Sequence, residues 1–294
     1  MKNSYLSEFC HEFGYSDSDS SALISAYELI EDDADASAYF DSAFNAYSND
    51  VNCDYGMILD CSRLAAEAAG IHKYTSDLLM FISLSRTLRR RYEEKGIPPE
   101  IFRDSLLDLK YKLTECKLVK GICGTFVGDW FPGFYRMTRF GLGRLQFETL
   151  GFGRSYSSRG LRLTPDSKVI NVHIPRTGTP LDKAGCDEAY VRAAEFFAEQ
   201  VSPIAFVCNS WLLFPANNRM LSPSSNIRRF ASEYDIIESG LFNDNGTAWR
   251  LFDTEEPDPD KLPADSSLRR AYIGYFKKGG IMGWGFGIRP EKPL

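Results

Sequence analysis

Residues 170–182 read INVHIPRTGTPLD, where an alternating apolar run gives way to a proline, a loop with one glycine and an aspartate. Alternation of Ile170, Val172 and Ile174 with polar residues is typical of a strand with one buried face. Asp182 is placed to cap a helix in the residues that follow. The stretch therefore predicts a strand-to-helix junction, which either turns the chain around or holds an anionic ligand beside His173.

The second half of the chain, from Trp130 onward, contains further short alternating runs broken by glycine and proline, which predict strands. Helical patterns lie between them, over about 182–200, 225–234 and 265–280. Interleaved strands and helices indicate a mixed sheet with helices packed on it. The predicted strands are GRLQFETL (143–150), KVINVHIP (168–175), PIAFVCNS (203–210), TAWRLFD (247–253) and IMGWGFGI (281–288).

The first half, from about Ser20 to Gly121, has apolar residues that recur at intervals of three and four, which predicts about five helices with short loops. Gly70 and Gly96 stand where helices end, and Pro98 and Pro99 stand where a new helix can begin. The sequence thus predicts an α+β protein with a helical N-terminal domain over 1–129 and a mixed-sheet domain over 130–294.

Composition restricts the class of partner. The 294 residues are 44% hydrophobic and 25% charged, with a net charge of -6, which is ordinary for a soluble globular protein. A net negative charge argues against nucleic acid or an anionic membrane as partner. The N-terminal residues lack the apolar core of a signal peptide, so we expect a cytoplasmic protein. The sequence gives no indication of the oligomeric state.

Cysteine and histidine usage argues against a disulfide framework and a zinc site. Seven cysteines form an odd number with no CxxC pair, so we expect reduced thiols. The three histidines are far apart in sequence and have no cysteine at ligand spacing. We therefore expect no metal site, with a magnesium site built from carboxylates left open.

The order of elements after residue 168 resembles the second half of the GNAT fold of acyl-CoA N-acyltransferases. The similarity runs through a strand, a loop, a long helix, a second strand, a helix over 226–240 and two final strands. The whole chain resembles a bacterial family with a helical N-terminal domain and a GNAT-like C-terminal domain. The motifs that carry the resemblance are GRLQFE (143–148), VHIP (172–175), SWLLxP (210–215), SNIxxF (225–230) and GGIMGWGFGI (279–288).

This resemblance implies acyl-CoA, with acetyl-CoA expected, as the co-substrate and an amine of a small molecule or peptide as the acceptor. It implies that backbone amides at the helix N-terminus hold the pyrophosphate, and that Asn209 and Ser210 bind the pantetheine amides or the acceptor. Against this, Pro180 removes an amide donor and Asp182 competes for the same amides. A plain capped connector therefore stays an equal alternative. The candidate cofactor residues are Ile174, Arg176, Thr177, Gly178, Thr179, Asn209 and Ser210.

His173 is the strongest catalytic candidate. Alternation places it with Asn171 on the face opposite Ile170 and Val172, and imidazole is well suited to take a proton from an amine at neutral pH. Glu148 is a second candidate base, or the partner of the imidazole. The other interpretation of His173 is a histidine hydrogen-bonded beneath a covering helix.

Tyr234 is the candidate acid for the leaving thiolate, although Phe230 competes for that place and a packing role is the alternative. The chemistry needs the strands at 168–175 and 203–210 to separate so that a thioester can enter between them. The alternative to an enzyme is a GNAT-like scaffold without catalysis that binds a ligand or a protein.

Overall fold

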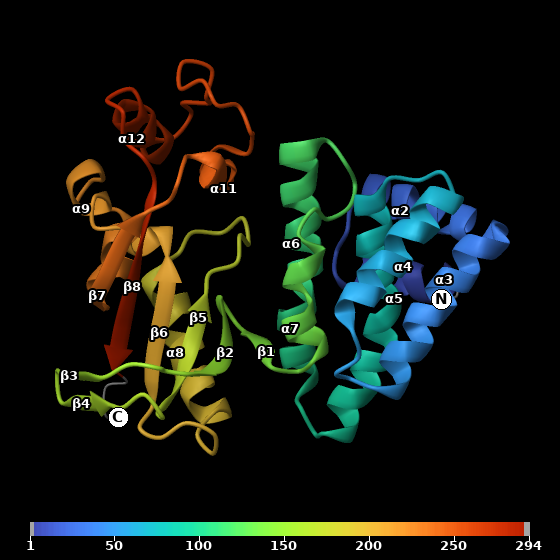
Figure 1. The fold of residues 1–294 in the computed structure, drawn as a ribbon, viewed down its shortest axis with the longest axis horizontal. Coiled ribbons are helices and arrows are strands. Elements are labelled where there is room, and N and C mark those ends of the chain that lie inside the picture. The colour runs from blue at the N-terminus through green and yellow to red at the C-terminus, as the bar shows by residue number, and fades with distance from the viewer. Residues whose placement is uncertain (1–2, 291–294) are drawn as a thin grey trace. The chain divides into compact units, whose positions relative to one another are not determined.

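The computed structural model describes residues 3–290, and the chain divides into two compact units, Met1–Gly141 and Leu142–Leu294. The sequence placed the domain boundary between residues 129 and 130, and that position stays a prediction. The α+β class is confirmed: helices form the first unit, and a mixed sheet with helices forms the second (Figure 1). Each unit is described by itself below.

The first unit consists of helices whose ends follow the sequence signals. Asp33 ends α2 and caps α3, because its carboxylate accepts the Ala36 N–H. Gly70 and Gly96 follow helix ends with positive φ, as expected for left-handed cap positions. The five helices expected between 20 and 121 are confirmed as α2 to α6. The elements are α1 (Asn3–Glu12), α2 (Asp17–Asp32), α3 (Ala34–Asn49), α4 (Tyr55–Ala68), α5 (Lys73–Glu94), α6 (Pro99–Lys120), η1 (Gly128–Trp130) and α7 (Pro132–Tyr135).

Helix α5 is the central helix of this unit. Its residues 75–85 are all buried, and it contacts α2, α3, α4 and α6. A helix that is buried on every side cannot show the apolar stripe of a surface helix, and residues 78–82 accordingly read LLMFI. Asp77 is the one charged side chain among the buried residues 75–85.

The second unit is built on a mixed sheet with the strand order β2-β5-β6-β8-β7 and a separate hairpin β3-β4. Strand β1 lies at the boundary between the two units. Strands β5 and β6 pair in parallel, whereas β2-β5, β6-β8 and β8-β7 are antiparallel. The strands are β1 (Arg139–Leu142), β2 (Leu145–Gly151), β3 (Tyr156–Ser158), β4 (Leu161–Leu163), β5 (Lys168–His173), β6 (Ala205–Ser210), β7 (Asp235–Leu241) and β8 (Gly283–Pro290). The helices are α8 (Lys183–Phe196), η2 (Trp211–Leu213), α9 (Asn217–Met220), α10 (Asn226–Ser232), η3 (Gly246–Ala248), α11 (Trp249–Phe252) and α12 (Ser267–Phe276).

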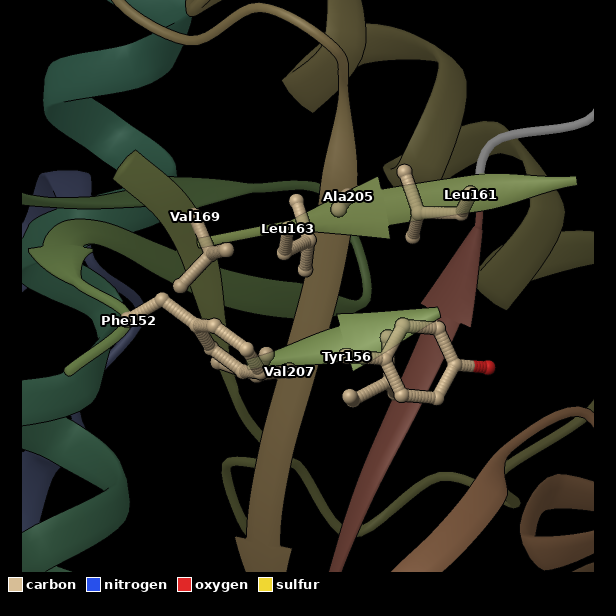
Figure 2. Packing of buried hydrophobic residues seen from close by; sticks show 8 residues of the cluster. Phe152, Tyr156, Leu161, Leu163, Val169, Ala205 and Val207 are labelled. Carbon is tan, nitrogen blue, oxygen red and sulfur yellow. The ribbon is translucent and has the colours of Figure 1, made fainter. Parts of the chain in front are cut away.

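The two faces of this sheet are covered differently. On one face, Tyr190 of α8 packs against Phe147 and Phe206. On the other face, the β3-β4 hairpin lies across the sheet, and its side chains pack on Val169 and Val207 (Figure 2). Because side chains alternate along a strand, Asn171 and His173 share the hairpin face with Val169, beyond its apolar cluster.

Two predicted elements are wrong. The run TAWRLFD was expected to be a strand, but it forms η3 and α11, and its Leu251 and Phe252 are buried in a cluster with Tyr272, Phe276 and Met282. Residues 235–240, which the resemblance placed in a helix, belong to β7 instead. These residues form a strand because they pair with β8 in antiparallel orientation, and such pairing overrides a weak local preference for helix.

The glycines of β8 lie where another backbone approaches closely. A Cβ on Gly283 would lie 2.3 Å from the Gly240 carbonyl oxygen, and one on Gly285 would lie 2.3 Å from that of Leu213. Hydrogens at these positions therefore let β7 and η2 pack directly on β8.

Candidate active site

His173 and Glu148 form a hydrogen-bonded pair on the hairpin face of the sheet. The β2-β5 register pairs Glu148 with Asn171 and Gln146 with His173, which brings the three polar side chains Glu148, Asn171 and His173 onto one face. His173 Nε2 lies 2.7 Å from Glu148 Oε1. The side chains are 21% and 20% exposed, so the pair is partly shielded and still reached by solvent.

The hydrogen bond determines which ring nitrogen of His173 carries hydrogen. An ionised carboxylate only accepts, so Nε2–H donates to Glu148 and a neutral ring keeps its lone pair on Nδ1. The Asn171 amide nitrogen lies 3.2 Å from the same carboxylate oxygen and 3.1 Å from Nε2. Its N–H therefore donates to Glu148 as well, which fixes the carboxylate from a second side.

Strands β5 and β6 pair over only a short distance. Their register contains two residue pairs, Ile170 with Phe206 and Asn171 with Val207. Continued pairing would place His173 beside Asn209, but within the described strands the ladder ends before those residues. The dyad therefore lies where the two parallel strands stop pairing, as the entry of a thioester between them requires.

The loop after β5 is held by contacts within the second unit. Arg176 is ion-paired with Asp253, its Nη2 donating at 2.8 Å, and Asp253 also accepts from Arg269 at 2.5 Å. The hydroxyls of Thr177 and Thr179 are 2.7 Å apart. Ile174 is half-buried, and Gly178 is exposed with a φ of 80°, a conformation that favours glycine.

Asp182 caps α8, as the connector interpretation expected. Its carboxylate accepts the Gly185 N–H at 2.9 Å. This hydrogen bond is the main cause that lowers the pKa of Asp182, and the positive charges of Arg144 and Arg229 lower it further. The same helix end thus has a carboxylate in place and two guanidinium groups close by.

Asn209 and Ser210 end β6. Asn209 is exposed and pairs with Phe286 in the β6-β8 register, while Ser210 pairs with Gly285. The Ser210 hydroxyl accepts the Leu212 N–H at 3.2 Å, so this residue also begins the turn η2. Both residues lie beyond the last β5-β6 pair, at the same end of the strands as His173.

Tyr234 lies in the core of the second unit, apart from the hydrogen bonds of the dyad. It is 3% exposed, and its hydroxyl is 2.6 Å from the hydroxyl of Tyr190. Burial raises the pKa of Tyr234 well above its usual range. The structure therefore does not bring Tyr234 together with the other candidates.

Sequence reasoning missed the residues that fix the candidates in place. Asn171 was placed on the correct face but was given no role. Arg144 was given no role, and its guanidinium donates to three carbonyls of the loop. Asp253 lies in an acidic stretch that reads as a surface loop. No local signal identifies Asp253, because its partner Arg176 is 77 residues away.

The Cys208 thiol is buried in the second unit. Burial raises the pKa of the Cys208 thiol, which disfavours the nucleophilic thiolate. Within residues 3–290, no group of three or more His, Cys, Asp or Glu side chains is arranged to hold a metal ion. In the same range, no helix combines the length and apolar character needed to cross a membrane.

Two family models together match most of the sequence. Residues 4–137 match a model described as an N-acyltransferase N-terminal domain, and residues 140–289 match one described as a GNAT-like C-terminal domain. A comparison with curated proteins gives no match. The second model alone spans half of the chain.

Solved structures share the fold over nearly the full length. One is an acyltransferase mutant in complex with octanoyl-CoA, with a TM-score of 0.77 and 21% identity, covering 97% of this chain and 87% of that one. Another is an acyltransferase in complex with decanoyl-CoA and teicoplanin, with a TM-score of 0.72 and 20% identity, covering 96% and 86%. At this identity the likeness shows a common fold.

Proposed function

We propose, from the premise that this chain belongs to the family of two-domain GNAT-like acyltransferases, that it transfers an acyl group from acyl-CoA to an amine. The observation that carries the proposal is the His173–Glu148 pair where β5 and β6 stop pairing. The structural neighbours hold octanoyl-CoA, decanoyl-CoA or CoA, which supports an acyl-CoA co-substrate. The acetyl group suggested by the sequence stays a prediction.

The acceptor is proposed to be an amine of a small molecule or peptide. Two of the neighbouring acyltransferase structures are complexes that contain teicoplanin with decanoyl-CoA, or 10C-teicoplanin with CoA, which supports a small-molecule or peptide acceptor.

The chemistry follows from the orientation of the imidazole. The amine nitrogen attacks the thioester carbonyl carbon, and His173 Nδ1 takes the amine proton as the C–N bond forms. The C–S bond then breaks, and the thiolate receives that proton from the imidazolium. His173 thus takes the proton from the amine and gives the same proton to the thiolate, so this path needs no second acid.

Glu148 acts through the histidine. Its carboxylate holds Nε2–H and thereby keeps the lone pair on Nδ1, and it stabilises the imidazolium that forms during attack. This division of roles is the same as in histidine–carboxylate pairs of other acyl-transfer enzymes.

The loop after β5, with Arg176, Thr177, Gly178 and Thr179, is proposed to bind the pyrophosphate, and Ile174 lies at the strand end that leads into it. Asn209 and Ser210 are proposed to contact the pantetheine. The fit is supported by the guanidinium groups around the α8 N-terminus, since a helix N-terminus with nearby cations favours anions. Arg176 must share or exchange its bond to Asp253 when phosphate binds.

The test is the rate of acyl transfer in His173→Gln, with His11→Gln as the control because His11 is an exposed residue of α1. Acceptor amines are offered with acetyl-, octanoyl- and decanoyl-CoA. We expect kcat to fall by a factor of about 100 in His173→Gln, while Kd for CoA stays within about twofold. Unchanged kcat in His173→Gln would contradict the assignment. CoA binding without transfer to any amine would indicate a scaffold.

A further inference from the structure

Arg144 lies in the turn before β2 and holds the loop that follows β5. Its Nη1 donates to the Pro175 carbonyl at 3.1 Å, its Nε to that of Pro180 at 3.3 Å, and its Nη2 to that of Thr179 at 3.4 Å. These bonds are individually long. Together they use the planar fork of one guanidinium to hold both ends of the loop, which a lysine ammonium cannot reproduce.

Arg229 of α10 holds the next residue of the loop from another element. Its Nη2 donates to the Leu181 carbonyl at 2.9 Å, and its Nη1 donates to Glu233 at 2.6 Å, which fixes the guanidinium. The side chain is 24% exposed.

The direction of these carbonyls determines the direction of the loop amides. In a trans peptide the C=O and the N–H of one unit point in opposite directions. The carbonyls of Pro175 and Pro180 face Arg144, and that of Leu181 faces Arg229. The N–H groups of Arg176, Leu181 and Asp182 therefore each point away from the guanidinium that holds their peptide unit. The Thr179 carbonyl contributes no amide, because proline follows it.

We propose that Arg144 and Arg229 are positioning residues that orient the amides of the 175–182 loop toward the pyrophosphate of CoA. The inference rests on the proposed function. It assigns to these arginines the organisation of the loop before binding, with no direct contact to substrate. Preformed amide donors bind a phosphate more tightly than mobile ones, because their ordering cost is met in folding.

The test compares CoA with pantetheine, which lacks the nucleotide and the pyrophosphate, by calorimetric titration of the full chain. Arg144→Lys keeps the charge and removes the fork. We expect Kd for CoA to rise about tenfold in Arg144→Lys and about threefold in Arg229→Lys, with Kd for pantetheine unchanged in both. Hydrogen exchange of the 176–182 amides without ligand should become faster. The matched control is Arg154→Lys, whose guanidinium pairs with Glu238.

The outcomes separate the inference from the proposed function. If wild type binds CoA and Arg144→Lys binds it equally well, the positioning role is overturned and the function stands. If Arg144→Lys weakens CoA and pantetheine to the same extent, the arginine supports the unit in general, and the inference is also overturned. If wild type does not bind CoA, the proposed function fails first.

Discussion

Replacing Asp77 with asparagine should stabilise the first unit at neutral pH. Asp77 is 3% exposed on the central helix α5, and its Oδ1 has no hydrogen-bond partner among the described residues. Burial raises the pKa of Asp77 from 3.8 to about 6, while a hydrogen bond from Ser62 and the charges of Arg63 and Lys73 oppose the rise. The folded state therefore favours the neutral carboxyl, and ionisation costs stability.

The size of the effect follows from the two pKa values. A difference of about 2 corresponds to about 3 kcal/mol. Because the folded pKa is the higher one, this stability is fully present below about pH 4 and is lost as the pH rises through about 6. At pH 7, Asp77→Asn should therefore raise the free energy of unfolding by about 2 to 3 kcal/mol, or the Tm by about 6 to 10 °C. At pH 4 the two proteins should differ little.

The assay is thermal and urea unfolding followed by far-ultraviolet circular dichroism at both pH values. Asp60→Asn is the control, because the Asp60 side chain lies on the neighbouring helix α4 and is 74% exposed, so it should change stability by less than about 0.5 kcal/mol. A variant at Asp77 that is no more stable than wild type at pH 7, or that differs equally at both pH values, would refute the reasoning.

Three further changes test particular contacts. Tyr234→Phe leaves the buried Tyr190 hydroxyl without its partner and should destabilise by about 1 to 2 kcal/mol with kcat within about twofold; a large loss of kcat at unchanged Tm would instead support Tyr234 as the acid. In Gly285→Ala the new methyl group would meet the Leu213 carbonyl, so the free energy of unfolding should fall by more than about 2 kcal/mol. In Gly274→Ala the methyl group on α12 has nothing within 4 Å, so the free energy of unfolding should rise by about 0.5 to 1 kcal/mol. Equal melting temperatures for the two variants would contradict both expectations. Asp253→Asn keeps a residue type that tolerates a φ of 61° and removes the negative charge between Arg176 and Arg269. The Tm should therefore fall by a few degrees at low salt and by less at high salt. A loss of Tm that does not depend on salt would show that the charge is not the cause.

The sequence predicts what local periodicity controls. Intervals of three and four identify α2 to α6, and alternation identifies β2, β5, β6 and β8. Alternation also places Asn171 and His173 on one face. Hairpin β3-β4 escapes prediction because each strand has three residues, which is too short for a period to appear.

The remainder depends on contacts between distant parts of the chain. Glu148 is 25 residues from His173, and only the β2-β5 register brings the two together. Segment 247–253 alternates like a strand, yet it forms helical turns whose Leu251 and Phe252 pack with Tyr272, Phe276 and Met282, residues at least 20 positions further along the chain. The roles of Arg144 and Arg229 depend on backbone carbonyls, which leave no trace in the residue pattern.

The most direct test of the account is a crystal structure with a non-hydrolysable octanoyl-CoA thioether analogue. We predict density for the ligand between the C-terminal ends of β5 and β6, with the carbon that replaces the thioester carbonyl close to His173 Nδ1 and the pyrophosphate at residues 176–182. A ligand bound elsewhere, or strands paired through His173 and Asn209 with the imidazole closed off from the ligand, would contradict the proposed site.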